Sequence, residues 1–548
     1  MLTVLILVPL VGALVIPFAP AAVSRSLALG VAFGTLGCGV ATAALYDYST
    51  DGARQLTEQV DWISAFGVHY ALGVDGLGLL MVLLTVVLVP IVMLAGWHEG
   101  ETAPRSYYGW MLALEALSLA VFCATDVFLF YVVFEATLIP AYFLIGGFGR
   151  KGRSAAALKF LMFQLAGGLV LLASVIGLYV VSAQQGTPSY LLSDLEQLDI
   201  GTTAGRWLFI GFFVAFAIKA PLFPVHTWLA DTTEQAPPGV SVMLVCVLDK
   251  IGTFGMLRFC LGIFPEASQW ATPVVVAIAL VSIIYGALVA IAQDDVLRLI
   301  GLTSLSHFGF ITLGIFVFSS QGGSGSVLYM VNHGLGTAAL FLVAGYVIRR
   351  RGTTLISEMG GLEKSTPVLA GLMLVSGLAT LALPGLSPFV SEFLVLLAAF
   401  DYHWWVGAIA VLGIVLAAVY VLWMYQRIFT GPGPETLVAD PHAGHHDHGD
   451  AEGDVHDVPL SGTASATSGG TATATAPAPA AAAVRAIPDA SRREIAAVAP
   501  LMVALVLFGF YPQPLLDTSN PYVERLMVQV GVTDDPPAVT GAGLQEGE

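Results

Sequence analysis

Charged residues are scarce in this chain of 548 residues. Asp, Glu, Lys and Arg make up 11% of it and hydrophobic residues 57%, whereas about a quarter of an ordinary soluble domain is charged. A soluble fold would have to hide apolar runs such as 77–97, 158–181 and 274–292, each near the roughly 20 residues that cross a bilayer as a helix. The composition therefore excludes a soluble protein and predicts an all-α integral membrane protein with many spans.

Cysteine is also rare, and its spacing excludes a metal or iron–sulfur centre. The four cysteines stand alone in apolar runs, without a CxxC pair. The sequence has no phosphate-binding loop and no GxGxxG after a strand. A basic patch with interleaved aromatics, which nucleic-acid binding would need, is missing as well. We therefore expect this chain to bind no metal, no cofactor and no nucleic acid. If it pumps a substance across the membrane, the energy for pumping must come from elsewhere.

The apolar runs predict about fourteen transmembrane helices. They lie near residues 2–18, 27–46, 74–97, 108–124, 126–147, 157–182, 205–229, 239–262, 272–292, 299–319, 326–348, 367–400, 405–429 and 495–511. Loops after odd-numbered helices hold fourteen Lys or Arg residues, and the other side holds four. Because cytoplasmic loops are rich in Lys and Arg, both termini should lie on the non-cytoplasmic side.

Acidic residues gather in polar segments, so the net charge of −17 says little about the membrane core. Residues 431–493 are first acidic and rich in histidine, then mostly Ala, Thr, Ser, Gly and Pro. Such a composition cannot offset chain entropy by burial, which predicts a disordered cytoplasmic loop. Its histidines could instead capture a divalent metal: His442, His445, His446, His448 and His456.

Two predicted spans contain proline next to a charge. Pro221 and Pro224 follow Lys219, and LPGLSP precedes Glu392. Proline frees backbone carbonyls, which only water or polar partners satisfy inside a membrane. Matching interruptions indicate an inverted-repeat transporter, although simple kinks for packing are the alternative. This divides the chain into helices 1–3 (1–107), two inverted five-helix repeats (108–262 and 272–429), the loop (431–493), and a last helix with a polar tail (494–548).

Ionisable side chains inside spans are functional candidates because each costs at least a few kcal/mol. Glu135 lies about 13.5 Å into its span at 1.5 Å per residue, and Lys219 lies at a similar depth. A nearby acid and base in low dielectric hold each other charged, so a moving charge would shift their proton affinity. A static buried salt bridge is the alternative. The whole set is Glu115, Glu135, Lys159, Lys219, Lys250, His307, His333 and Glu392.

Several motifs together resemble one known family. They read DVFLFYVVFEATLIPAYFLIGGFG, FAIKAPLFPVHTWLADTTEQAP, DKIGTFGMLRF, LTSLSHFGFITLG, VNHGLGTAALFLVAG and LPGLSPFVSEF. As an ordered set over roughly residues 70–430, they resemble the antiporter-like proton-pumping subunits of respiratory complex I (NADH-quinone oxidoreductase), and among these the subunit M or chain 4 group. The resemblance implies fourteen helices in two inverted repeats, with helices seven and twelve discontinuous.

The resemblance also implies roles for single residues. Glu135 matches the channel acid of helix five, Lys219 the lysine of the broken helix and Lys250 the connecting lysine of helix eight. The central histidines match His307 and His333, the exit residue matches Glu392, and Lys159 matches a helix-six lysine; Lys159 and Glu115 are secondary members. Glutamate at 392 favours subunit M, because subunits L and N and Mrp-type subunits usually carry lysine there.

Some positions depart from the family pattern. Where the family usually has LPDAHTEAP, this chain has LADTTEQAP, with Ala230, Thr233 and Gln235 in place of Pro, His and Glu. Roles of those side chains in the loop are therefore in doubt. Asp249, beside Lys250, and the 431–493 insert also look specific to this lineage.

The resemblance implies a proton-translocating subunit in the bilayer of the bacterial inner (plasma) membrane. Its partners would be L-like and N-like subunits and, through them, the peripheral redox arm. FMN, iron–sulfur clusters and quinone would belong to those partners. Alternatives are a subunit of an Mrp-type cation/proton antiporter or of a membrane-bound hydrogenase, and a stand-alone secondary transporter.

Overall fold

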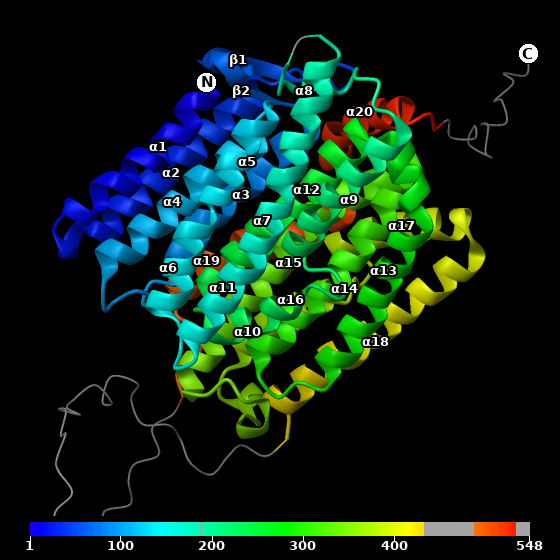
Figure 1. Cartoon of the computed structure of the whole chain (residues 1–548). Coiled ribbons are helices and arrows are strands. Elements are labelled where there is room, and N and C mark those ends of the chain that lie inside the picture. Colours follow the sequence, from blue (N-terminus) through cyan, green and yellow to red (C-terminus); the bar gives the residue numbers. More distant parts are fainter. Residues whose placement is uncertain (187, 432–486, 533–548) are drawn as a thin grey trace, which may run out of the picture.

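The computed structural model describes residues 1–186, 188–431 and 487–532. Helices run side by side from α1 and α2 on one flank to α18 on the other (Figure 1). The bounds are α1 Leu2–Val15, α2 Ala21–Leu45, β1 Gln55–Ile63, β2 Val68–Val74, α3 Gly76–Ala95, α4 Pro104–Cys123, α5 Val127–Ala136, α6 Leu138–Phe148, α7 Arg153–Gln184, α8 Leu192–Leu195, α9 Thr202–Lys219, α10 Thr227–Gln235, α11 Pro238–Met243, α12 Lys250–Gly255, α13 Pro265–Ile291, α14 Val296–Phe316, α15 Ser320–Arg351, α16 Pro367–Thr380, α17 Ser387–Tyr402, α18 Trp404–Phe429, α19 Arg492–Phe510 and α20 Gln513–Gln529. Nearly all of the predicted loop, including its five histidines, lies outside the described residues, as does the chain beyond 532.

Twelve helices of the described residues are long and apolar enough to cross a membrane, and Leu2–Phe18 and Pro367–Thr380 are shorter apolar helices. The prediction of a helical membrane protein is therefore confirmed. Short polar side chains begin several of these helices by accepting hydrogen bonds from free backbone N–H groups. Asp126 accepts from two N–H groups of α5, and Asp295 does the same for α14.

The two expected interruptions are present. The first separates α9 from α10 directly after Lys219. The second separates α16 from α17, which begins five residues before Glu392. Two further irregularities were not expected. The predicted helix 126–147 is interrupted at Thr137, and α12 lies between π-helical turns at Leu244–Leu248 and Met256–Leu261. Such π-helical turns occur frequently at functional sites.

A β-hairpin and an amphipathic helix lie at one end of the bundle, and neither was predicted (Figure 1). Strands β1 and β2 pair antiparallel, with Gln55 opposite Val74 and Ile63 opposite Val68. Helix α20 falls in the segment expected to be a polar tail. Its buried side includes Tyr522, Val523 and Leu526, and it packs against α3 and α15.

The opposite end carries ion pairs between loops and helix ends. Arg150 lies 3.1 Å from Asp295, Arg427 2.7 Å from Asp294, and the Arg350 guanidinium 2.7 Å from Glu494. The basic partners come from the loops expected to face the cytoplasm. Opposite charges at this end therefore neutralise one another in pairs.

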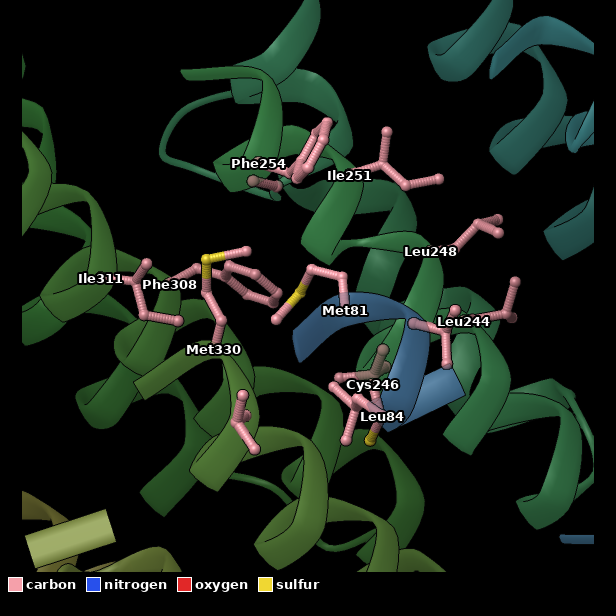
Figure 2. Packing of buried hydrophobic residues seen from close by; sticks show 14 of the residues in the cluster. Met81, Leu84, Leu244, Cys246, Leu248, Ile251, Phe254, Phe308, Ile311 and Met330 are labelled. Atoms are coloured by element: carbon pink, nitrogen blue, oxygen red, sulfur yellow. The ribbon is translucent and has the colours of Figure 1, made fainter. Parts of the chain in front are cut away.

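Helix α12 occupies the centre of the packed core. The cluster in Figure 2 brings Met81 and Leu84 of α3 together with Phe254 of α12, Phe308 of α14 and Met330 of α15. Residues 239–261 of the span Pro238–Leu261 are all buried inside the protein. Charged side chains on this segment are therefore held away from lipid and bulk water, where electrostatic interactions are strong.

Candidate functional site

Lys219 and Glu135 lie at facing helix breaks. Lys219 is the last residue of α9 and is buried, and its Nζ lies 3.4 Å from the Thr137 hydroxyl and 4.7 Å from the centre of the Phe134 ring. Glu135 lies against the backbone of α7, since a Cβ added to Gly168 would be 1.8 Å from its Oε1. Among the described residues this oxygen is buried without a hydrogen-bond partner. The Glu135 carboxylate and the Lys219 ammonium interact electrostatically. The group in direct contact with the ammonium is the Thr137 hydroxyl, not the Glu135 carboxylate.

Lys250 begins α12 and connects it to α15. Its fully buried Nζ lies 2.5 Å from Nδ1 of His333 and 4.4 Å from the centre of the Phe308 ring. An ammonium donates to a neutral imidazole nitrogen, so Lys250 and His333 can share one proton.

Three further side chains continue the line to α17. The ring centres of His333 and His307 are 5.1 Å apart. Nδ1 of His307 lies 2.7 Å from the Tyr329 hydroxyl, which donates a hydrogen bond of 3.1 Å to Oε2 of Glu392. A hydroxyl donates one hydrogen bond while accepting another, so Tyr329 connects the histidine to the carboxylate.

The arrangement holds groups that bind and release protons in a lateral row across the bundle. The members of this row are Glu135, Lys219, Lys250, His333, His307, Tyr329 and Glu392. Asn332 stabilises its far end, because its amide donates to the Ser387 carbonyl at 2.8 Å and so ties α15 to the start of α17. The Nε2 atoms of His307 and His333 are buried without partners among the described residues. Buried polar atoms of this kind are satisfied by ordered water in proteins. The row has the chemistry of a proton wire and no binding group for a larger solute.

Tyr329 and Thr137 were missed at the sequence level. A signal existed for Tyr329, since it precedes His333 by four residues and therefore shares its helix face. Thr137 follows Glu135 by two residues, and nothing in the local pattern distinguishes it.

The two secondary members lie outside the row. Lys159, expected within a span, is partly exposed near the ion-pair end, where its Nζ lies 2.6 Å from Asp231. Arg298 also contacts Asp231, at 2.6 Å, and Glu234, at 2.8 Å. Glu115 is fully buried on α4, and neither of its carboxyl oxygens has a hydrogen-bond partner in the described chain.

Replacing Lys159 by glutamine is expected to change proton pumping by less than about fivefold, because a partly exposed ion pair contributes at most about 1 kcal/mol. Arg298 continues to pair with Asp231 in this variant. Proton uptake into inverted membrane vesicles measures the effect. A complete loss of pumping would instead place Lys159 within the essential row.

Comparison with known proteins agrees with this geometry. Residues 124–417 match the family described as NADH:quinone oxidoreductase/Mrp antiporter, TM. The chain is 43% identical to NADH-quinone oxidoreductase subunit M of Mycobacterium tuberculosis, over 98% of this chain and 96% of that protein.

Two solved structures are also similar. A chain of respiratory complex I from Thermus thermophilus with bound NADH is 30% identical, with a TM-score of 0.81, and covers 97% of this chain and 100% of that one. A chain of the Mrp complex from Dietzia sp. DQ12-45-1b is 25% identical, with a TM-score of 0.80, over 96% and 98%. The expected resemblance is thereby confirmed. The chain belongs to the subunit M family of NADH-quinone oxidoreductase, the proton-translocating membrane subunits of respiratory complex I.

Proposed function

We propose that protons cross this subunit along the row of buried side chains. They enter from the cytoplasm at Glu135 and Lys219, pass laterally through Lys250 and leave to the opposite side from Glu392. Between these points they use His333, His307 and Tyr329. The observation that carries the proposal is the set of contacts from the Lys250 ammonium to the Glu392 carboxylate, which joins α12, α15, α14 and α17.

The drive is electrostatic in this proposal. A charge that approaches Glu135 or Lys219 changes the proton affinity of both groups, since each interacts with the other through space. Neighbouring L-like and N-like subunits supply that charge while the peripheral arm, with its FMN and iron–sulfur clusters, reduces quinone. This subunit supplies only proton carriers.

The helix arrangement supports two inverted repeats within fourteen spans. Residues 108–262 and 272–429 each contain a helix broken beside prolines, α9–α10 and α16–α17, with Lys219 and Glu392 near the breaks. Residues 1–107 and 494–548 flank them. The ion-pair end faces the cytoplasm of a bacterial inner membrane in this proposal, and the hairpin end, with both termini, faces away.

A cation/proton antiporter of the Mrp type is the second candidate, because it shares the fold. Identity to subunit M is much higher, and glutamate at 392 favours it as well. The proteins that copurify in mild detergent separate the two, since redox subunits accompany only subunit M.

Replacing Tyr329 by phenylalanine tests the row. This change removes one hydroxyl and breaks the contact between His307 and Glu392. We expect proton pumping, measured per NADH oxidised in inverted vesicles, to fall about a hundredfold, the lower end of the range for a lost proton-transfer group.

Tyr420→Phe is the matched control. Tyr420 is also buried near Glu392, but its hydroxyl has no hydrogen-bond partner among the described residues. This variant should pump normally. Normal pumping by Tyr329→Phe in an assembled complex would contradict the proposed route.

A further inference from the structure

Asp249 is a buried acid that the proposed route does not use. It directly precedes Lys250, at the junction of a π-helical turn and α12. Its side chain is buried, and among the described residues Oδ2 has no hydrogen-bond partner. A buried carboxyl oxygen without a partner is costly, so its presence in the core calls for a function.

Asp249 lies on the helix surface between a contact with α9 and a contact with α15. On one side, Gly252 of α12 packs against the end of α9. A Cβ added to Gly252 would be 2.5 Å from the backbone nitrogen of Ala220, the residue after Lys219. On the other side, Lys250 reaches His333 of α15. Successive residues of a helix turn by about 100°, and Asp249 falls between these two directions. It therefore lies where the α9 break meets the lateral row.

The charges agree with this placement. The Asp249 carboxylate interacts electrostatically with the ammonium groups of both Lys219 and Lys250. Lys219 makes no hydrogen bond to Lys250 in the described chain, and its ammonium contacts the Thr137 hydroxyl instead. Two ammonium groups repel each other, whereas a carboxylate between them can accept a proton from one and donate it to the other.

We propose that Asp249 carries the proton from Lys219 to Lys250, an inference that rests on the proposed function. In the first step an N–H bond of the Lys219 ammonium breaks and an O–H bond forms on Asp249, which leaves a neutral amine and a neutral acid. In the second step that O–H bond breaks and an N–H bond forms on the Lys250 amine. One proton moves, and the carboxylate is regenerated.

Asp249→Asn tests this step in the intact complex in inverted membrane vesicles. Asparagine has nearly the same shape but cannot accept and release a proton on the transfer route. We expect NADH-driven pumping and coupled turnover to fall about a hundredfold, the lower end of the range for a lost proton-transfer group. The solvent deuterium isotope effect on turnover should rise, since proton transfer becomes rate-limiting. Asp249→Glu, which keeps a carboxyl group, should restore most of the rate.

Thr253→Val is the matched control on the same helix. The Thr253 hydroxyl donates only to the backbone carbonyl of Lys250, so its loss should leave pumping and the isotope effect unchanged. If Asp249→Asn does not assemble, Asp249→Leu, which suits the apolar surroundings, is measured with the same expectation.

Lys219→Met separates the failure of this inference from the failure of the proposed function. Loss of pumping in Lys219→Met, with the wild-type rate and isotope effect in Asp249→Asn, overturns the role of Asp249 and leaves the route intact. An equal loss in Asp249→Asn and Asp249→Glu without a change in isotope effect also overturns it, because that result indicates a structural role. Normal pumping by Lys219→Met overturns the route itself.

Discussion

Lys250→Met is expected to abolish proton pumping while the complex still assembles. Lys250 is fully buried and contacts His333, the first member of the row toward Glu392. Methionine has a similar length and packs well in apolar surroundings, but it binds no proton. Removing a group that transfers protons costs about 10²–10⁴-fold in rate. Pumping per NADH in inverted vesicles measures the loss, and a native gel of the membrane checks assembly.

Lys250→Arg distinguishes a proton carrier from a static charge. Arginine keeps the positive charge but does not release a proton in proteins. We therefore expect this variant to lose pumping nearly as completely as Lys250→Met. Met256→Leu, a conservative buried change in the following π-helical turn, should pump normally. Wild-type pumping by Lys250→Arg would mean that only a fixed charge is needed at this position.

The broken helices and most of the buried row could be predicted from the sequence because their signals are local. Proline beside a charge in an apolar run identifies a break without knowledge of the neighbours. Lys219, Lys250 and Glu392 are conspicuous for the same reason, since a charge within a span is rare.

Features that depend on contacts between distant helices could not be predicted in this way. Tyr329 is one aromatic residue in an apolar helix until His307 and Glu392 are placed beside it. Arg258 lies near the end of the predicted helix 239–262, where no local pattern indicates its pairing with Asp75, 183 residues away. Lys159 lies within the span Arg153–Gln184, as expected, but this helix is longer than the membrane thickness, and it carries Lys159 to the ion-pair end, where it contacts Asp231.

Asp75→Asn is expected to destabilise the subunit by about 3–5 kcal/mol, because it leaves the buried Arg258 guanidinium without its charged partner. The two side chains form a bidentate pair, with Nη2 of Arg258 2.9 Å from Oδ1 of Asp75. Asparagine keeps an oxygen that can cap α3 through the backbone N–H of Gly78. The variant therefore removes the charge with little loss of helix capping.

The pair also connects three parts of the hairpin end. The Arg258 guanidinium lies 4.9 Å from the centre of the Phe254 ring and 5.4 Å from that of Tyr522 in α20. Loss of the pair should thus weaken the attachment of α20. A lower melting temperature of the purified complex and less assembled subunit in the membrane would report the change.

Arg258→Met combined with Asp75→Asn tests whether the unpaired Arg258 charge causes the loss of stability in Asp75→Asn. Replacing both partners of a buried ion pair by uncharged groups is often neutral or stabilising, whereas removal of one partner is not. The double variant should therefore recover most of the melting temperature that Asp75→Asn loses. If instead the double variant is less stable than either single variant, the side chains stabilise the bundle through separate contacts. The destabilisation by Asp75→Asn then cannot come from an uncompensated charge, and α20 is held instead by its packing against α3 and α15.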